Sequence, residues 1–326
     1  MADSHCQVLS TLRQRAKKQP QRILFPEGGD SRVLQAANLL SEQGWCLPII
    51  CNPAPDIPLH PTVQEVSIND SQLREQAAAQ LIENRKDKGV DHATAMEMIN
   101  NPLLFATLLV RTGFADGTVA GSLASTASVI RAGLYGVGTP SNGKLVSSFF
   151  LMQFQNRAVT YADCGVVPDP NAEQLAEIAV SAAKNHSLLT GENPKVAMLS
   201  FSTHGSANHP HIDKVVRATE IARTLAPTME IDGELQFDAA WVPEVAKRKA
   251  PDSTVAGQAN VFVFPNLAAG NIAYKITERL AGAQALGPLV QGLQQPCMDL
   301  SRGCSVQDIA DVAVIASIMA TGKQKA

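Results

Sequence analysis

The chain has 326 residues, of which 45% are apolar, 17% charged and 5% aromatic, and its formal net charge is −3. This length suffices for two ordinary domains, and the composition is that of a globular protein. The slight acidic excess argues against a broad nucleic-acid surface, although a few arginines could still bind a small anion. No segment has the length and apolarity of a signal peptide or a bilayer span, and the six cysteines form no Cys-x-x-Cys pair, so we expect a cytoplasmic protein with reduced thiols.

A pattern of strand, small-residue turn and helix recurs along the chain. Residues 22–25 form an apolar run, residues 26–29 turn the chain, and Asp30 has the position of a helix N-cap. Asn171 begins another helix, with Gln174 at the capping-box position. The full pattern returns three times. A strand at residues 116–120 precedes a helix at residues 126–134, a strand at residues 196–201 precedes a helix at residues 212–225, and a strand at residues 260–264 precedes a helix that ends near residue 280. This alternation predicts an α/β fold with mainly parallel sheets. A cluster of Gly, Pro, Ser and Asn at residues 138–144 marks a plausible domain change.

The segment at residues 299–308 carries the strongest local signal for chemistry. Ser301 and Arg302 stand just before a predicted helix, where free backbone N–H groups and the helix dipole attract anions. Ser305 and Asp308 have the spacing of a capping box, so the local pattern alone favours a segment that only starts the helix. Cys304 could be a thiol of low pKa at a helix start, or a small buried cysteine.

Two other turns are rich in small hydroxylated residues. Both follow a predicted strand, so their backbone N–H groups and hydroxyls could bind phosphate. The first turn continues to Arg131, whose side chain could reach an anion or lie in solvent. Ordinary helix capping explains the hydroxyls of this turn equally well. His204 and its neighbours match no zinc spacing. The candidate residues are Ser122, Ser125 and Thr126 in the first turn, and Ser202, Thr203, Gly205 and Ser206 in the second.

Two glycine-containing patterns fail as nucleotide motifs. Residues 138–145 resemble a P-loop, but Leu145 replaces the required Ser or Thr and the segment follows a helix. Residues 136–141 lack the third glycine of the dinucleotide fingerprint.

Taken together, segments along almost the whole chain closely resemble phosphate acetyltransferase. The matching segments begin at Arg22, Ala115, Val129, Val146, Ala162, Val196, Ile231, Ala250, Ala259, Gly270 and Leu300, in the family's order. The Gly121–Ala127 stretch is closest to the short, single-module form of ethanolamine utilisation, because it lacks the His of the housekeeping pattern. His204 likewise stands where many members have Lys.

The resemblance implies two α/β/α domains with mainly parallel sheets and an active site in the interdomain cleft. The second domain, residues 143–289, would be inserted into the first, residues 1–142 plus 290–326. The family implies a homodimer in the cytoplasm, free or inside a bacterial microcompartment, with no membrane or nucleic-acid partner. It also implies no bound cofactor and no metal, with coenzyme A, acetyl phosphate and phosphate as substrates.

Roles follow from the resemblance residue by residue. Ser301 and Arg302 match the family's catalytic Ser-Arg pair, and Asp308 matches its general base. The resemblance also identifies three substrate-binding arginines, the last of them associated with coenzyme A: Arg131, Arg279 and Arg85.

Three other functions are open to a chain of this kind. A phosphate butyryltransferase would use longer acyl groups, although the Leu-Ser-Arg-Gly-Cys-Ser segment favours acetyl. A decarboxylating dehydrogenase of related fold would need acidic metal ligands and a dinucleotide site that the sequence does not display. A non-catalytic shell or scaffold protein would leave Ser301, Arg302 and Asp308 unexplained.

Overall fold

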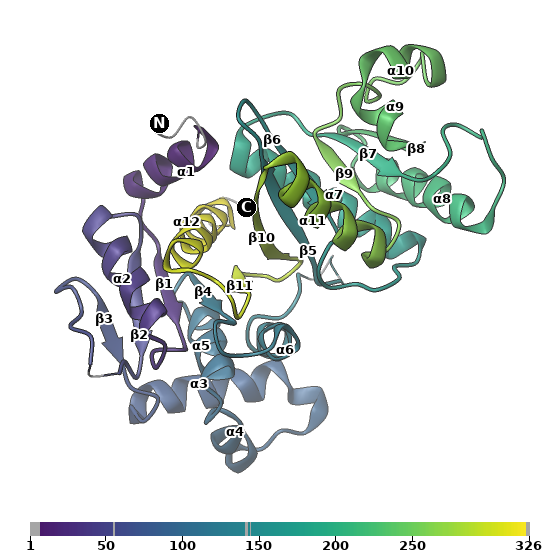
Figure 1. The fold of residues 1–326 in the computed structure, drawn as a ribbon. Helices are drawn as coiled ribbons and strands as arrows, with labels where there is room; N and C mark the ends of the chain where they lie inside the picture. Colours follow the sequence, from purple (N-terminus) through teal and green to yellow (C-terminus); the bar gives the residue numbers. More distant parts are fainter. Residues whose placement is uncertain (1–6, 55, 141–142, 144, 324–326) are drawn as a thin grey trace. The chain divides into compact units, whose positions relative to one another are not determined.

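The computed structural model describes residues 7–54, 56–140, 143 and 145–323. Its contacts divide the chain into two compact units, whose elements are labelled in Figure 1. We call residues 9–144 with 293–326 the terminal unit. We call residues 145–292, with which the start of the first helix is grouped, the central unit.

The terminal unit is built on a five-stranded sheet in the order β11-β4-β1-β2-β3, in which every neighbouring pair is parallel. Its strands are β1 (Arg22–Phe25), β2 (Leu47–Cys51), β3 (Gln64–Val66), β4 (Gly117–Ala120) and β11 (Cys297–Asp299). Its helices are α1 (Gln7–Lys18), α2 (Ser31–Gln43), α3 (Ser71–Asn84), α4 (His92–Met98), α5 (Pro102–Arg111), α6 (Thr126–Gly136) and α12 (Val306–Lys323), with a short 3₁₀ turn η1 (Lys86–Lys88).

Helices cover both faces of this sheet. Helix α12 packs on β1, β4 and β11 and lies beside α2, as Figure 1 shows. Helices α5 and α6 pack against each other and cover β4, β1 and β11. Residues 103–110 of α5 are all buried, and all of them except Thr107 are apolar, so this helix has no polar face. The sheet between these two helix layers fixes where the turns after β1, β4 and β11 lie.

The central unit has a six-stranded mixed sheet in the order β10-β5-β6-β9-β7-β8. The pairs β10–β5 and β5–β6 are antiparallel, and the remaining pairs are parallel. Its strands are β5 (Ser147–Gln153), β6 (Ala158–Ala162), β7 (Lys195–Leu199), β8 (Glu230–Leu235), β9 (Val261–Val263) and β10 (Gln284–Gln291). Its helices are α7 (Ala172–Thr190), α8 (Pro210–Leu225), α9 (Phe237–Trp241), α10 (Pro243–Lys249) and α11 (Leu267–Ala281).

The α/β prediction is confirmed, since both units have a mostly parallel sheet flanked by helices. The predicted helix starts are also confirmed at three caps: Asp30, Ser125 and Asn171 each accept a hydrogen bond from a backbone N–H of the first turn, and Asn171 forms the full capping box with Gln174. In the described residues no single helix is both long and apolar enough to cross a bilayer; α4 and α5 pass that test only as a pair bent by 114°.

Candidate active site

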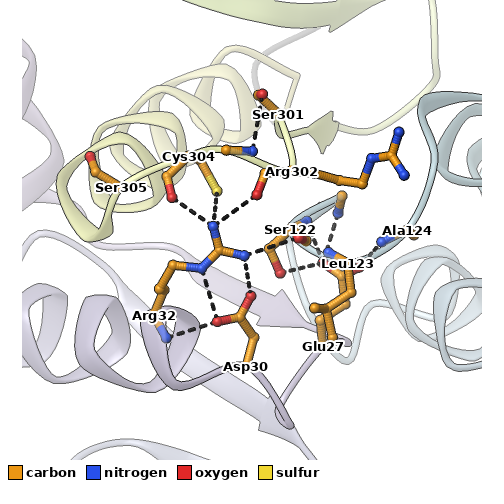
Figure 2. Close-up of polar contacts among 12 residues, drawn as sticks. Glu27, Asp30, Arg32, Ser122, Leu123, Ala124, Ser301, Arg302, Cys304 and Ser305 are labelled. Carbon is orange, nitrogen blue, oxygen red and sulfur yellow. Dashed lines mark hydrogen bonds and ion pairs between the residues drawn. The ribbon is translucent and has the colours of Figure 1, made fainter.

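Three turns of the terminal unit meet at one edge of its sheet. They follow β1, β4 and β11, which are neighbours in the sheet and parallel, so their carboxyl ends lie together. Figure 2 shows the result: Glu27 and Asp30 follow β1, Ser122 follows β4, and Ser301 follows β11. The parallel sheet thus brings together residues separated by more than 170 positions.

The turn after β4 closes around a carboxylate of the protein itself. Glu27 Oε2 accepts from the backbone N–H groups of Gly121 and Ser122 at 2.7 and 2.8 Å, and from the Ser122 hydroxyl at 3.0 Å. Glu27 Oε1 accepts from the N–H groups of Leu123 and Ala124 at 3.0 and 2.7 Å. Four successive N–H groups form the kind of concave nest that binds anions. A phosphate at these groups would have to displace Glu27, which weighs against the predicted phosphate contact of Ser122.

Arg32 joins the turn after β4 to the turn after β11. Its guanidinium forms a bidentate ion pair with Asp30, with nitrogen–oxygen distances of 2.6 and 3.1 Å. It also donates to the carbonyl oxygens of Ser122, Arg302 and Cys304 at 3.0, 2.9 and 2.8 Å (Figure 2). Burial alone would raise the pKa of Asp30, but the hydrogen bonds from Arg32 outweigh it and lower that pKa below its ordinary value.

Asp299 is a second buried carboxyl at this edge. It is 1% exposed, and its Oδ2 accepts from the Thr126 hydroxyl at 2.6 Å. Its Oδ1 is buried without a hydrogen-bond partner among the described residues. Burial raises the pKa of Asp299 to about 6; the Thr126 hydrogen bond opposes this rise and the nearby Glu27 charge adds to it. Gly121 has a φ of +106°, and a Cβ there would lie 2.5 Å from Asp299 Oδ1, so only glycine fits.

Ser301 and Arg302 are exposed at the start of the turn after β11. The Ser301 hydroxyl accepts from the N–H of Gly303 at 3.3 Å, so its own proton stays available to donate. In the part of the chain that the structure describes, the Arg302 guanidinium makes no hydrogen bond or ion pair, whereas its carbonyl oxygen is held by Arg32. The main chain of this turn is therefore anchored, while the Arg302 guanidinium and the hydroxyl proton of Ser301 remain available.

Asp308 forms the predicted capping box at the start of α12. Its Oδ2 accepts from the N–H and the hydroxyl of Ser305, both at 2.8 Å, and the Ser305 hydroxyl accepts from the N–H of Asp308 at 3.1 Å. Within the described residues, Asp308 Oδ1 makes no hydrogen bond. The hydrogen bonds of the capping box are therefore confirmed, and they leave Asp308 Oδ1 able to accept a further hydrogen bond or a proton.

Cys304 is not the low-pKa thiol that its position could suggest. It is buried, and burial raises the pKa of its thiol even though the Arg32 charge opposes the rise. The alternative interpretation, a small buried cysteine, is the one that the structure supports.

The predicted arginines of the terminal unit lie at the end of α3 and on α6. Arg131 is exposed on α6, in the second turn after the cap at Ser125. Arg85 is the C-cap residue directly after α3, and its guanidinium carbon lies 4.1 Å from the centre of the Tyr135 ring on α6. Its Nε is buried without a hydrogen-bond partner in the described residues. The cation–π contact with Tyr135 already orients this guanidinium.

In the central unit the hydroxyl-rich turn after β7 is also organised by a carboxylate. Glu234 Oε1 accepts from the Ser202 hydroxyl at 2.7 Å and from the N–H of Gly205 at 2.9 Å. The hydroxyls of Thr203 and Ser206 accept backbone N–H groups of Gln236 and Thr203, both at 3.0 Å. These contacts give the turn a structural explanation, and its predicted binding role stays a prediction.

Arg279 lies apart from these turns in sequence, in the last turn of α11. Its side chain is exposed, and its Nε lies 3.6 Å from Glu278 of the same turn. Among the described residues, no group of three or more His, Cys, Asp and Glu side chains is arranged to hold a metal ion.

Four residues of this site were not predicted as functional: Glu27, Asp30, Arg32 and Asp299. The sequence pattern indicates Asp30 only as a helix cap and Glu27 only as part of the turn at residues 26–29. Their partners are 90 or more residues away in the chain, except for the local Asp30–Arg32 pair. An acidic residue near the end of each of two strands, Glu27 after β1 and Asp299 at the end of β11, was the available signal, but it does not say which distant group the residue contacts.

A family model described as "Phosphate acetyl/butaryl transferase" matches residues 7–317. The chain belongs to this family. It is 46% identical over 325 residues to a phosphate acetyltransferase of Acetivibrio thermocellus, covering 96% of this chain and 98% of the relative.

Two solved structures are also similar. The EutD phosphotransacetylase from Staphylococcus aureus has a TM-score of 0.90 and 39% identity, covering 96% of this chain and 98% of that one. A phosphotransacetylase from Streptococcus pyogenes has a TM-score of 0.89 and 41% identity, covering 97% and 98%.

Proposed function

We propose that this chain is a phosphate acetyltransferase, which interconverts acetyl-CoA plus phosphate with acetyl phosphate plus coenzyme A. The observation that carries the proposal is the 46% identity to a phosphate acetyltransferase over nearly the full length of both chains. This makes it an acyltransferase of acetate metabolism. The Gly121–Ala127 segment additionally supports a role in ethanolamine utilisation, which stays a prediction, as does the cytoplasmic or microcompartment location.

The reaction toward acetyl-CoA needs a base, an oxyanion donor and a phosphate site. Free thiols ionise near about pH 8.5, so a base must take the coenzyme A proton at neutral pH. In our proposal Asp308 takes that proton, the sulfur bonds to the acetyl carbon, and the carbon–oxygen bond to phosphate breaks with its electron pair on the departing phosphate. Ser301 and the start of α12 stabilise the developing oxyanion, while Arg302 and Arg131 bind phosphate.

The arrangement of hydroxyl protons supports these roles. Ser122, Thr126 and Ser202 each donate their single hydroxyl proton to a carboxylate, so that proton is not available for phosphate. The Ser301 hydroxyl instead accepts a hydrogen bond from the N–H of Gly303 and keeps its own proton available. Phosphate recognition in this proposal therefore depends mainly on arginines, and oxyanion stabilisation on Ser301.

Anchoring of the backbone supports the same roles. Arg32 holds the carbonyls of Arg302 and Cys304, and Glu27 holds the turn beside them. Donors that are fixed before the reaction need no reorganisation during it, which is the main source of electrostatic catalysis. We include Arg85, Arg279 and the turn at residues 202–206 as further substrate contacts on the basis of the family resemblance.

We also propose the two-domain division into residues 1–142 plus 290–326 and residues 143–289, which the division of contacts at residues 145 and 293 supports.

A homodimer is proposed on the basis of α11, which exposes Ile272, Ile276 and Leu280. These positions are four residues apart and lie on one helix face. Such an exposed apolar stripe is typical of an interaction surface.

The test is an assay of the purified chain with acetyl phosphate and coenzyme A, following thioester absorbance, and with phosphate and acetyl-CoA in reverse. We expect turnover in both directions, undiminished by EDTA, and falling from acetyl to butyryl substrates. An absence of thioester formation would overturn the proposed function, and a preference for butyryl would replace it with the longer-chain alternative.

A further inference from the structure

Asp299 is the last residue of β11, and two parts of the proposed site begin beside it. Its backbone pairs with Ala120, the last residue of β4, and the N–H of Leu300 still donates to the Ala120 carbonyl at 2.8 Å. Beyond this point the two strands separate. One chain continues into the turn that carries Ser301 and Arg302, and the other continues through a short turn into α6.

The Asp299 side chain connects these two branches. Its Oδ2 accepts a hydrogen bond from the hydroxyl of Thr126, the first residue of α6, at 2.6 Å. Helix α6 lies beside β11 and packs on it (Figure 1). Arg131 is exposed in the second turn of the same helix. Because a helix shifts as a rigid element, a contact at its first residue also sets the position of Arg131.

Close packing leaves the two branches little freedom at this point. A Cβ on Gly121 would lie 2.7 Å from the nitrogen of Leu300, so the turn after β4 is in direct contact with the chain that follows β11. In the same turn, the hydroxyl of Ser122 donates to Glu27, which belongs to the turn after β1. The hydroxyl of Thr126 is therefore the one that joins the start of α6 to the end of β11.

Burial of the Asp299 carboxyl has a cost that an apolar contact at this position would avoid. The residue is 1% exposed, and its Oδ1 has no hydrogen-bond partner among the described residues. A buried carboxyl that is incompletely paired destabilises a fold relative to an apolar side chain of similar volume. Such a group next to the residues of a site is a candidate for a role in that site.

We propose that Asp299 is a positioning residue of the phosphate site. By accepting the Thr126 hydroxyl it holds the start of α6 against the end of β11. This contact fixes Arg131 relative to Ser301 and Arg302. The inference rests on the proposed function, which assigns these three residues to acetyl phosphate. A displacement of about 1 Å among groups that bind one substrate lowers the reaction rate by about 10²-fold.

The first test removes the Thr126 hydroxyl and keeps the shape of the side chain. Thr126→Val is compared with wild type and with Thr126→Ser, which keeps the donor. Thr112→Val is the matched control, because the Thr112 hydroxyl also lies at a helix end and donates to the Leu109 carbonyl at 3.0 Å. The probe is inorganic phosphate, and the rise of the melting temperature with phosphate concentration gives its affinity for the full chain. We expect phosphate binding to weaken by about tenfold in Thr126→Val, as for the loss of one charge-assisted contact, and to stay near wild type in the other two variants.

Kinetics give a second readout. In Thr126→Val the kcat/KM for acetyl phosphate should fall by about 10–100-fold, while the KM for coenzyme A stays near wild type. A lower melting temperature with phosphate affinity and kcat/KM unchanged would make the Thr126 contact merely structural and overturn the inference. An equal loss in Thr126→Ser also overturns it, since the hydroxyl would then not be the cause.

A double variant separates positioning from a direct contact between the Thr126 hydroxyl and phosphate. Asp299→Ala removes the acceptor and frees that hydroxyl, whereas Asp299→Asn keeps an acceptor and should bind phosphate like wild type. We expect Asp299→Ala to lose phosphate affinity, and Asp299→Ala combined with Thr126→Val to lose no more than either single variant. Phosphate affinity that persists in Asp299→Ala and falls in Thr126→Val overturns the inference and makes Thr126 a direct ligand. Loss of phosphate affinity in both single variants of a chain that forms no thioester would support the positioning role and overturn the proposed function instead.

Discussion

At the scale of single residues, the two carboxylate oxygens of Asp308 have different hydrogen-bond surroundings. Oδ2 is occupied by the N–H and hydroxyl of Ser305, and Oδ1 has no hydrogen bond within the described residues. One oxygen therefore serves the helix start, and the other can accept a proton from a substrate. A substitution that preserves size but removes basicity separates these two duties.

Asp308→Asn should reduce turnover far more than stability. Loss of the charge at the helix start should cost about 0.3–1 kcal/mol of unfolding free energy. Loss of a general base commonly lowers kcat by about 10²–10⁴-fold. The measurements are the melting temperature and kcat at saturating substrates.

Ser305→Ala is the matched control, because it removes the capping hydroxyl and keeps the carboxylate. It should cost about 1 kcal/mol of stability with kcat within a few-fold of wild type. If Asp308→Asn loses stability and keeps its rate per folded molecule, Asp308 is only a cap and the base lies elsewhere.

Asp299 makes the stability of the protein depend on pH. Its pKa in the folded chain is about 6, against an ordinary value of 3.8, because burial disfavours the charged form. The folded state therefore holds the proton more tightly than the unfolded state. This stabilisation is present in full below the ordinary pKa and is lost as the pH rises through the folded pKa. Glu27 adds to the effect, while Thr126 opposes it.

Asp299→Asn should remove this dependence. Whatever constant cost the amide brings, the unfolding free energy of the variant relative to wild type should rise by about 2–3 kcal/mol between about pH 4 and about pH 8. Denaturant unfolding at several pH values measures it. The exposed carboxylate of Asp87 offers a control, since Asp87→Asn should run parallel to wild type. A constant difference between Asp299→Asn and wild type across this range would show that Asp299 does not titrate there.

At the scale of elements, the strand–turn–helix units were predictable because their signals are local. Predicted strands at residues 22–25 and 116–120 correspond to β1 and β4, and the helix at residues 212–225 corresponds to α8 within two residues. Caps such as Asn171 mark helix starts within a few residues of sequence. The same locality explains what was not predicted: β11 has only three residues, and its pairing with β4 joins segments nearly 180 residues apart.

The turns show how a local pattern can identify an anion site and still miss its occupant. Free N–H groups and hydroxyls after β4 and β7 correctly indicated a preference for negative charge. The charge is supplied by Glu27 and Glu234, which reach these turns from other strands. Only the sheet order brings β1 next to β4 and β8 next to β7. Long-range contacts, rather than spacing, decide which of the candidate turns remains open to a ligand.

At the scale of the whole molecule, the exposed face of α11 is the feature that a single chain leaves unexplained. Leu280 is 84% exposed, and Ile272 and Ile276 are more than half exposed on the same face. Covering three such side chains would stabilise an association by several kcal/mol from apolar burial. Because the chain is proposed to form a homodimer, the simplest partner for this face is the same face of a second copy, related by twofold symmetry.

Ile276→Asp should convert the dimer to monomers. An unpaired carboxylate at the centre of an apolar interface would be repeated in both copies, and its desolvation should cost enough to weaken association by about 10³-fold or more. Sedimentation equilibrium should give wild type twice the 34.6 kDa mass of one chain, and the variant that mass itself. Leu225→Asp, at an exposed leucine on α8, introduces the same charge away from α11 and should remain dimeric. A wild type that sediments as a monomer would refute the dimer, whereas a dimeric Ile276→Asp would move the interface away from α11. Circular dichroism of the variant would confirm that its fold is intact, so that loss of the dimer can be assigned to the α11 face alone.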